Sequence, residues 1–374
     1  MKAESKGLYV HIPFCQSKCN YCDFSSFPSV DENTRGRYIS NLICEIKSYK
    51  QEKKIKVDTV FFGGGTPSLL SKEEFVKICK AIFESFDTSQ IKEFTIEANP
   101  KTLTREKLLV YKSFGVDRLS IGLQSIHDKE LKILGRIHNF DDFKTAYDMA
   151  LSCGFRNINV DVMYGIPEQT KESFAQTLTA LTSLKPTHIS AYGLILEEKT
   201  KFWEVRNTLN LPSEDDECDM YELACGFLRK NGYLHYEISN YALSACQSKH
   251  NLKYWKCEEY IGVGVAAHSY LDGKRYSNSS SFSEYLTENR REYIYEKNRS
   301  LLDEKQEYVM LRLRLDSGIS LSEYEELFGE SLLSKNELKL ERYISLGYMK
   351  RSEDRIALTE KGFYVSNSIL SDFM

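Results

Sequence analysis

Apolar and amphipathic stretches alternate along the first half of the chain. Six short apolar stretches are typical of β-strands, at 8–14, 57–62, 93–98, 118–124, 157–164 and 188–194. Between them, helical periodicity occurs at 32–53, 71–85, 104–114, 127–152 (interrupted near residue 139) and 170–184. Strands that alternate with amphipathic helices predict parallel pairing through right-handed crossovers. The pattern therefore predicts an α/β fold in which helices cover a parallel sheet.

Several of these strands carry polar side chains along one face. In the third, fourth and fifth strands that face holds Thr95, Glu97, Asn99, Ser120, Gly122, Gln124, Asn157, Asn159 and Asp161. Because side chains alternate across a strand, the apolar set must pack under the helices and the polar set must line the other face. A closed eight-stranded barrel would fill its interior with branched apolar side chains. We therefore predict an open, partial (β/α)6 TIM-like barrel that holds a hydrophilic ligand.

The second half of the chain follows a different pattern. We expect a helix at 214–231, a tyrosine-rich strand at 233–242, and a glycine-punctuated segment at 260–270 that completes the sheet or crosses beneath its mouth. Beyond residue 300, the pattern predicts helices at 305–315, 320–328 and 334–346, a strand pair at 348–358 that turns at residue 354, and a final helix at 359–370. Ser320 with Glu323, and Ser334 with Glu337, have capping-box spacing. We expect a barrel core at 1–230, a sheet extension and connecting segment at 231–300, and a winged-helix-like domain at 301–374.

Composition and charge exclude several classes of function. The chain has 374 residues, of which 41% are hydrophobic and 28% are charged, and its net charge is -4. The two signs are intermixed, so no nucleic-acid partner is expected, since binding to phosphates needs a clustered basic face. No signal-peptide core and no run of eighteen apolar residues occurs. We therefore expect a cytoplasmic protein whose membrane contact, if any, is peripheral.

Three of the ten cysteines stand together directly after the first strand. Cys15, Cys19 and Cys22 have the spacing C-x3-C-x2-C, which lets three thiolates converge on one inorganic centre. A zinc site would usually add a second pair of ligands, but no second C-x2-C and no H-x3-5-H pair occurs. An iron–sulfur cluster can be held by cysteines alone. The loop therefore predicts a cluster with one iron open to a ligand from outside the protein.

This loop resembles the signature of the radical S-adenosylmethionine (SAM) superfamily. The resemblance includes the aromatic residue Tyr21 before the last cysteine. In that superfamily, three cysteines hold three irons of a [4Fe–4S] cluster, and the amino and carboxylate groups of SAM chelate the fourth. The resemblance thus implies a [4Fe–4S] cluster and SAM as cofactors, with Cys15, Cys19 and Cys22 as the metal ligands.

Candidate SAM-binding groups follow the strand ends, where ligands bind in parallel sheets. The second strand runs into Gly63-Gly64-Gly65-Thr66-Pro67. A backbone without Cβ atoms can approach the methionyl amine of SAM closely, whereas a phosphate loop would need a G-K-[ST] ending. At the other strand ends stand side chains that suit the polar groups of SAM: Glu97, Gln124, Arg136 and Asp161. The alternatives are structural carboxylates and an arginine on the surface.

Over nearly its whole length the chain resembles the oxygen-independent coproporphyrinogen III oxidase family of radical SAM proteins. The shared motifs include the segment from Tyr9 to Cys15, the cysteine loop, the glycine turn, and Tyr164-Gly165-Ile166-Pro167. The oxidases proper carry a further cysteine where this chain has Phe24. The haem chaperone branch, HemW, has Asp-Phe after the third cysteine and an H-N-x-x-Y-W motif. Both stand here, the second as His250-Asn251-Leu252-Lys253-Tyr254-Trp255.

The resemblance to this branch implies roles for individual residues. It implies SAM contacts at Tyr9, Tyr21, Gly64, Gly65, Thr66, Glu97, Gln124, Arg136, Asp161 and, through its backbone, Ile195. It implies that His250 belongs to a haem-associated motif; from the residues alone, a structural histidine inside the fold is equally compatible. A neutral imidazole can ligate haem iron, and Tyr254 and Trp255 could stack on a macrocycle.

Two functions of different class remain open from the sequence. One is a haem-binding chaperone with a SAM-ligated cluster that delivers haem to a haem-accepting membrane protein. The other is an enzyme that decarboxylates two propionates of coproporphyrinogen III through a 5′-deoxyadenosyl radical. Phe24, the short N-terminus and the motif at His250 favour the chaperone. The sequence leaves open whether SAM is cleaved and whether two copies form a homodimer.

Overall fold

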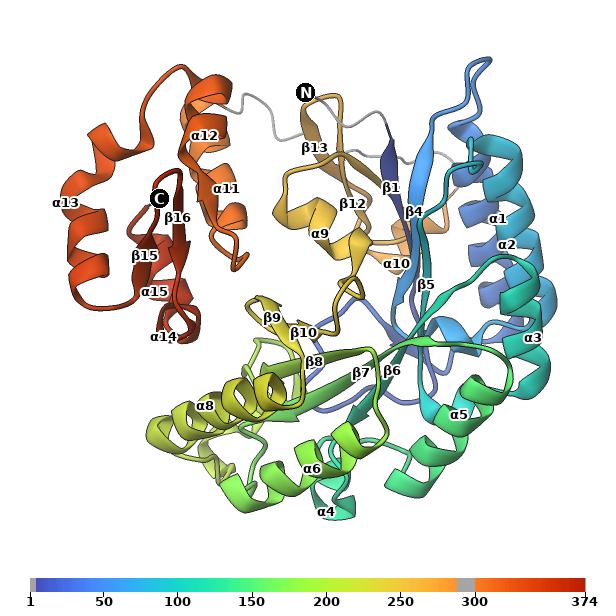
Figure 1. Cartoon of the computed structure of the whole chain (residues 1–374). Helices are drawn as coiled ribbons and strands as arrows, with labels where there is room; N and C mark the ends of the chain where they lie inside the picture. The colour runs from blue at the N-terminus through green and yellow to red at the C-terminus, as the bar shows by residue number, and fades with distance from the viewer. Residues whose placement is uncertain (1–4, 288–299, 374) are drawn as a thin grey trace.

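The larger part of the molecule is built on one long sheet. The computed structural model describes residues 5–287 and 300–373. Within these residues, eleven strands pair in the order β13-β12-β11-β1-β4-β5-β6-β7-β8-β10-β9 (Figure 1). The consecutive parallel strands are β1 (Lys6–Ile12), β4 (Val57–Gly64), β5 (Glu93–Ala98), β6 (Arg118–Gln124), β7 (Asn157–Tyr164) and β8 (His188–Gly193). The six predicted strands and their parallel pairing are confirmed.

Helices cover the outer face of this sheet (Figure 1). They are α1 (Glu32–Ser48), α2 (Lys72–Ser85), α3 (Arg105–Ser113), α4 (Asp128–Ile133), α5 (Phe140–Ser152) and α6 (Lys171–Ser183). The predicted interruption near Asn139 is confirmed, because the Asn139 side chain caps α5 in a capping box with Asp142. Short helical turns follow two strand ends, η1 (Pro67–Leu69) and η2 (Pro100–Thr102).

The two faces of the sheet differ as the alternation predicts. On β1, Leu8, Val10 and Ile12 are completely buried in the core under the helices. On the inner face, polar side chains bond one another across strands. Asn159 donates to Ser120 Oγ over 2.8 Å and to Asp161 Oδ1 over 2.7 Å. Packing of the apolar outer face against the helices stabilises the sheet, and the polar side chains lie on its inner face.

The sheet does not close, because antiparallel strands end it on both sides. β11 (Tyr260–Val263) pairs in parallel with β1, and β12 (His268–Leu271) and β13 (Lys274–Ser277) continue outward. The segment at 260–270 was expected either to complete the sheet or to cross beneath its mouth. It extends the sheet. The single strand predicted at 233–242 is wrong: it is a hairpin of β9 (Leu234–Glu237) and β10 (Asn240–Ala242). The Glu237 side chain accepts a hydrogen bond from Asn240 and tightens the turn.

Helical segments connect the sheet extensions to the core. They are α7 (Lys201–Glu204), η3 (Arg206–Thr208), α8 (Glu214–Lys230), α9 (Lys249–Trp255) and α10 (Phe282–Tyr285). Two short strands flank the cysteine loop, β2 (Phe14–Cys15) and β3 (Phe27–Pro28). The H-N-x-x-Y-W motif therefore forms α9. Part of the predicted connecting segment, 288–299, lies outside the described residues.

The C-terminal elements form a smaller body beside α9 and β9 (Figure 1). They are α11 (Leu301–Arg312), β14 (Ile319–Ser320), α12 (Leu321–Phe328), α13 (Leu332–Ser345), β15 (Met349–Arg351), β16 (Arg355–Leu358), α14 (Glu360–Tyr364) and α15 (Ser366–Ser371). Three of these strands pair as β14-β16-β15. This order of elements agrees with the predicted winged-helix-like arrangement.

Three details of this body differ from the prediction. The first predicted helix begins at Leu301 and ends at Arg312. The helix expected from Ser334 begins two residues earlier, at Leu332, so Ser334 lies inside it and its hydroxyl donates to the Ser331 carbonyl. The final helix is interrupted at Val365, whose backbone leaves the helical region at φ -101° and ψ 20°. No described helix has both the length and the apolar character needed to cross a membrane.

Candidate functional site

The three predicted cluster cysteines lie between the end of β2, where Cys15 is the last residue, and β3, with Cys19 and Cys22 in the loop that joins the two strands. All three side chains are half-buried, and the Cys22 amide donates to the Cys19 carbonyl over 3.3 Å. The loop is tied to the end of α4, because the Asn20 amide donates to the Leu134 carbonyl over 3.0 Å. Burial raises the pKa of the Cys22 thiol to about 11. A thiolate at this position therefore needs the positive charge of a bound metal to form readily.

The glycine turn after β4 packs directly under the start of the cysteine loop. The Gly65 amide donates to Ile12 over 2.8 Å, and the Thr66 amide donates to Phe14 over 2.7 Å. Gly64 has a φ of +108°, and a Cβ atom there would lie only 2.5 Å from the His11 ring. Only glycine combines this backbone conformation with such a close approach. The turn thus sets the height of the cysteine loop above the strand ends.

Two carboxylates face the inner side of the sheet beside this turn. Glu97 Oε2 accepts a hydrogen bond from the Gly64 amide over 3.2 Å. Burial, and then the charge of Asp161, raise the pKa of Glu97 to about 8. Burial also raises the pKa of Asp161, against the opposing effect of hydrogen bonds from Asn159 and Ser190. The positive charges of Arg118 and Arg136 oppose these shifts without cancelling them. A cationic or hydroxyl-rich ligand beside the pair would favour the charged carboxylates further.

Arg136 reaches from the segment after α4 to the cysteine loop. Its Nη1 lies 3.5 Å from Cys19 Sγ, and its Nη2 donates to the Gly122 carbonyl over 2.9 Å. A Cβ atom at Gly122 would approach Nη2 to 3.0 Å, so the small residue makes room for the guanidinium. Within the described part of the chain, the buried Arg136 Nε has no hydrogen-bond partner. The surface alternative for Arg136 does not apply, and one donor remains for a ligand.

Three more predicted residues belong to the end of β6, to the cysteine loop and to the loop after β8. Gln124 is a buried non-glycine residue with φ 72°, placed at a shift in the register between β6 and β7. Such strained conformations cluster at functional sites. Tyr192 donates to Gln124 Oε1 over 3.0 Å. Burial raises the pKa of Tyr21 on the cysteine loop, and the charge of the Arg136 guanidinium opposes this rise. Ile195 follows β8 in a loop and its side chain is 62% exposed.

These observations fit a SAM-ligated cluster. Three thiols lie on one loop, and the adjacent strand ends carry two carboxylates whose pKa values burial raises in spite of the nearby guanidiniums of Arg118 and Arg136. Arg136 Nε, which has no hydrogen-bond partner in residues 5–287 and 300–373, is a donor that suits a carboxylate. SAM carries a sulfonium, an amine, a carboxylate and a ribose diol, which complement this set.

His250 lies at the opposite end of the strands from the glycine turn. Its Nδ1 hydrogen-bonds Thr59 Oγ1 over 2.9 Å, and its Nε2 hydrogen-bonds Tyr254 Oη over 2.8 Å. The ring also stacks on Phe61 at 5.2 Å. Thr59 precedes Gly63 by four positions on β4, roughly 13 Å of strand. His250 is therefore buried with both ring nitrogens bonded, and burial lowers its pKa to about 3.

The rest of the H-N-x-x-Y-W motif borders an aromatic cavity. The buried carboxylate of Glu93 accepts hydrogen bonds from the first amides of α9 and fixes the helix on β5. A cavity of about 500 Å³ then opens between α9, the cysteine loop, β12, β13 and α11. We call it the aromatic cavity; its lining is Tyr9, His11, Asp23, Phe24, Ser25, Tyr254, Trp255, Tyr260, Ala266, His268, Arg275, Glu307 and Leu311.

Sequence reasoning missed one whole wall of this cavity. Phe24, 61% exposed, and Trp255 were both singled out from motifs. His268, Arg275 and the residues of α11 were not, because they belong to an irregular hairpin and to a separate domain. Only the folded chain brings these segments together, and no local pattern marks them.

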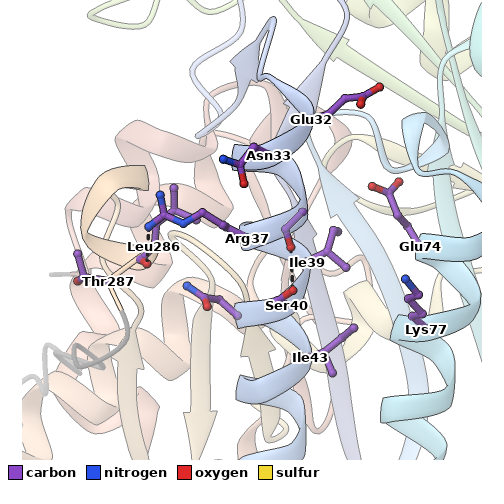
Figure 2. Close-up of a pocket in the computed structure, with 12 residues that line it drawn as sticks. Glu32, Asn33, Arg37, Ile39, Ser40, Ile43, Glu74, Lys77, Leu286 and Thr287 are labelled. Carbon is purple, nitrogen blue, oxygen red and sulfur yellow. Dashed lines mark hydrogen bonds between the residues drawn. The ribbon is translucent and has the colours of Figure 1, made fainter.

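A different cavity lies on the outer surface, on the helix side of the sheet. It has a volume of about 850 Å³ and lies between α1, α2 and the residues that follow α10 (Figure 2). Charged side chains border it, including Glu32, Arg37, Glu74 and Lys77. Arg37 donates to the Leu286 carbonyl over 3.4 Å across its edge. Among the described residues that line it, none is a predicted cluster or SAM residue.

Comparisons with known proteins agree with this architecture. Residues 9–181 match the model of the radical SAM superfamily, and residues 300–365 match the HemN C-terminal domain. A solved structure titled "Coproporphyrinogen III oxidase (HemN) from Escherichia coli is a Radical SAM enzyme" superposes with a TM-score of 0.85 at 22% identity. The match covers 99% of this chain and 90% of that chain. This match shows the common fold.

Curated relatives are similar along the whole chain. A protein named heme chaperone HemW from Lactococcus lactis is 37% identical, with 100% of this chain and 98% of the relative covered. Proteins of the same name from Bacillus subtilis and Escherichia coli are 35% and 33% identical, each with 99% of the relative covered. The chain therefore belongs to the radical SAM superfamily and, within it, to the family of the proteins named heme chaperone HemW.

Proposed function

We propose that this protein is a haem chaperone that carries a SAM-ligated [4Fe–4S] cluster and delivers haem to acceptor haemoproteins, including membrane-bound ones. The observation that carries the proposal is the aromatic cavity, which joins Phe24 of the cysteine loop to Tyr254 and Trp255 of α9. Its volume of about 500 Å³ lies within the range of roughly 300–1,000 Å³ that is common for cofactor pockets. The relatives named heme chaperone support the same conclusion.

In this proposal Cys15, Cys19 and Cys22 hold the cluster. When bound and reduced, the cluster supplies an electron to the sulfonium of SAM. The chain's own residues hold and orient SAM: Gly64, Gly65 and Thr66 through the backbone, and Tyr9, Tyr21, Glu97, Gln124, Arg136, Asp161 and Ile195 around its polar groups and adenine. The low exposure of this region keeps water away from the cluster side of the sheet.

Haem binds separately, against the aromatic walls of the cavity. A flat macrocycle stacks well on Phe24 and Trp255, and aromatic contacts of this kind are each worth roughly 0.5–1.5 kcal/mol beyond the buried area. Trp255 also brings a buried indole Nε1 that has no hydrogen-bond partner among the described residues. The cavity suits an aromatic, partly polar ligand better than a fully apolar one.

We assign His250 a positioning role in the haem-associated motif. Its bond to Tyr254 Oη fixes the phenol ring, which in turn packs edge-on against Tyr260 at 4.5 Å. Both tyrosines line the aromatic cavity. A change at His250 is therefore expected to alter haem binding through the shape of the cavity.

Two assays on one anaerobically reconstituted sample test the proposal. We expect a ferric haem titration to show saturable binding, and we expect no vinyl groups to form from coproporphyrinogen III in the presence of SAM and a reductant. A known coproporphyrinogen III oxidase serves as the positive control for decarboxylation. Vinyl formation by this chain would contradict the chaperone proposal and favour the oxidase, and absence of haem binding would also refute it.

A further inference from the structure

The aromatic cavity has a polar wall on β12 and β13 that faces its aromatic side chains. β12 and β13 pair so that Tyr270 lies opposite Arg275 and His268 lies opposite Ser277. Because alternate residues of a strand share a face, His268, Tyr270 and Arg275 project from the same side of this hairpin. His268 and Arg275 both line the cavity. An imidazole and a guanidinium therefore stand on one wall.

The histidines of the chain differ in their surroundings. The chain has seven, all within the described residues. Six are buried or half-buried: His11, His127, His138, His188, His235 and His250. The seventh, His268, is exposed, and its place on β12 puts it at the cavity.

Only His11 and His268 among these histidines line the aromatic cavity. His11 is 5% exposed; its Nε2 donates to the Ser25 carbonyl over 2.9 Å and its Nδ1 bonds Tyr9 Oη over 2.9 Å. Ligation of iron by His11 would break one of these buried bonds and move the ring that packs against Gly64. His268 is exposed on the wall of the cavity and lies outside the core, so burial does not keep its ring from an iron atom there.

We propose that His268 is the protein ligand to haem iron, and that Arg275 beside it pairs with a haem propionate. This inference rests on the proposed haem-binding function. A neutral imidazole donates a nitrogen lone pair to the iron, whose oxidation state does not change. The guanidinium of Arg275 lies 4.3 Å from the Tyr270 ring centroid and also pairs with Glu307. It has five N–H donors, so it can hold Glu307 and a carboxylate at the same time.

The two walls of the aromatic cavity would contact different parts of haem. Phe24, Tyr254 and Trp255 provide the aromatic surface for the macrocycle, and the β12–β13 hairpin provides the iron ligand and the cation. Glu307 comes from α11, so the C-terminal domain closes the same wall and holds the guanidinium in place. The C-terminal domain thus contributes to the haem site.

Ferric haem and metal-free protoporphyrin IX, titrated in parallel into the full-length protein, test the assignment. In His268→Ala we expect the imidazole-type Soret and visible bands to disappear and the ferric haem affinity to fall by about tenfold or more. Protoporphyrin IX has no iron to ligate, so its affinity should change by less than about twofold. Added imidazole should restore the bands, and His268→Gln should behave like the alanine variant. His127→Gln, which alters a histidine outside the cavity, is the matched control.

Three outcomes would overturn the assignment, and they are distinguishable. An unchanged ferric haem spectrum in both His268 variants would refute iron ligation by His268 and leave the proposed function intact. Equal loss of haem and protoporphyrin IX binding would assign His268 a role in the shape of the cavity instead. If the unaltered protein binds neither porphyrin, the proposed function itself fails.

Discussion

Two regions of different chemistry meet at the cysteine loop. On one side, the ends of β4 to β7 present carboxylates, an amide and a guanidinium that are buried and bonded into a network. On the other side, the aromatic cavity presents partly exposed rings, with a histidine and an arginine on one wall. The first region suits a small, highly polar ligand, and the second suits a flat aromatic one. The same loop can therefore contact both ligands at once.

The contrast also separates the two histidines that could be associated with haem. His250 is buried in the core, where it joins α9 to β4. His268 is exposed at the cavity. His250 belongs to the H-N-x-x-Y-W motif and His268 does not. Of these two, only His268 lies where a ligand in the cavity can reach it directly. Substitutions in each region should therefore have different effects.

Loss of a cluster ligand should have an all-or-none effect. In Cys19→Ser we expect the broad visible absorbance of the reconstituted cluster to disappear, because two thiolates cannot hold the cubane. Cys44→Ser, an exposed cysteine on α1, should keep the absorbance and is the matched control. An unchanged spectrum in Cys19→Ser would refute the ligand assignment.

The two histidines should differ sharply in their contribution to stability. His250→Ala removes a buried ring and two hydrogen bonds, so we expect the free energy of unfolding to fall by about 3 kcal/mol. His268→Ala changes an exposed side chain and should stay within about 0.5 kcal/mol. Chemical denaturation of cluster-free protein measures both values. Equal effects of the two substitutions would remove the basis for their different roles.

The acidic strand ends should make stability depend on pH. The pKa of Glu97 is about 8 in the folded chain against 4.5 in the unfolded chain. The folded state therefore binds more protons between these values, and its stability should fall as pH rises from about 5 to about 8. We expect the melting temperature of ligand-free protein to show this decline, and Glu97→Gln to lose part of it. SAM, with its sulfonium charge, should reduce the decline; a pH profile identical in both proteins would contradict the assigned environment of Glu97.

A single ring of the aromatic cavity should have the smallest effect. Phe24→Ala removes one stacking surface, so we expect haem affinity to fall by about fivefold, or about 1 kcal/mol. The cluster absorbance should not change, since Phe24 is not a ligand. Leu338→Ala on α13, where the side chain is 83% exposed, is a control for loss of an exposed apolar group. Unchanged haem affinity in Phe24→Ala would place the macrocycle away from the cysteine loop.

The polar region was largely predictable from the sequence, because it follows local rules. Apolar runs in the sequence locate the strands. Polar residues at alternate positions of a strand then share one face, and this determines which side chains meet at the strand ends. Glu97, Gln124 and Asp161 could therefore be assigned to one face before the structure was known. Their roles as SAM contacts stay predictions.

The aromatic cavity was not predictable in the same way. Its residues come from β1, the cysteine loop, α9, β11, β12, β13 and α11, and only tertiary packing brings them together. Burial of His250 depends on Thr59 and Phe61, which lie far away in the sequence. The errors at 233–242 and at Ser334 have a similar cause, because a tight turn and an early helix start are set by contacts that a periodic pattern does not contain.

The position of haem iron in the folded protein tests the central claim most directly. An anomalous difference map at the iron edge, from crystals of the cluster-free protein grown with ferric haem, would locate the metal. We expect one strong peak in the aromatic cavity, next to His268 on β12 and between that strand and α9. A peak at another place, such as the outer cavity over α1 and α2 in Figure 2, would contradict the account.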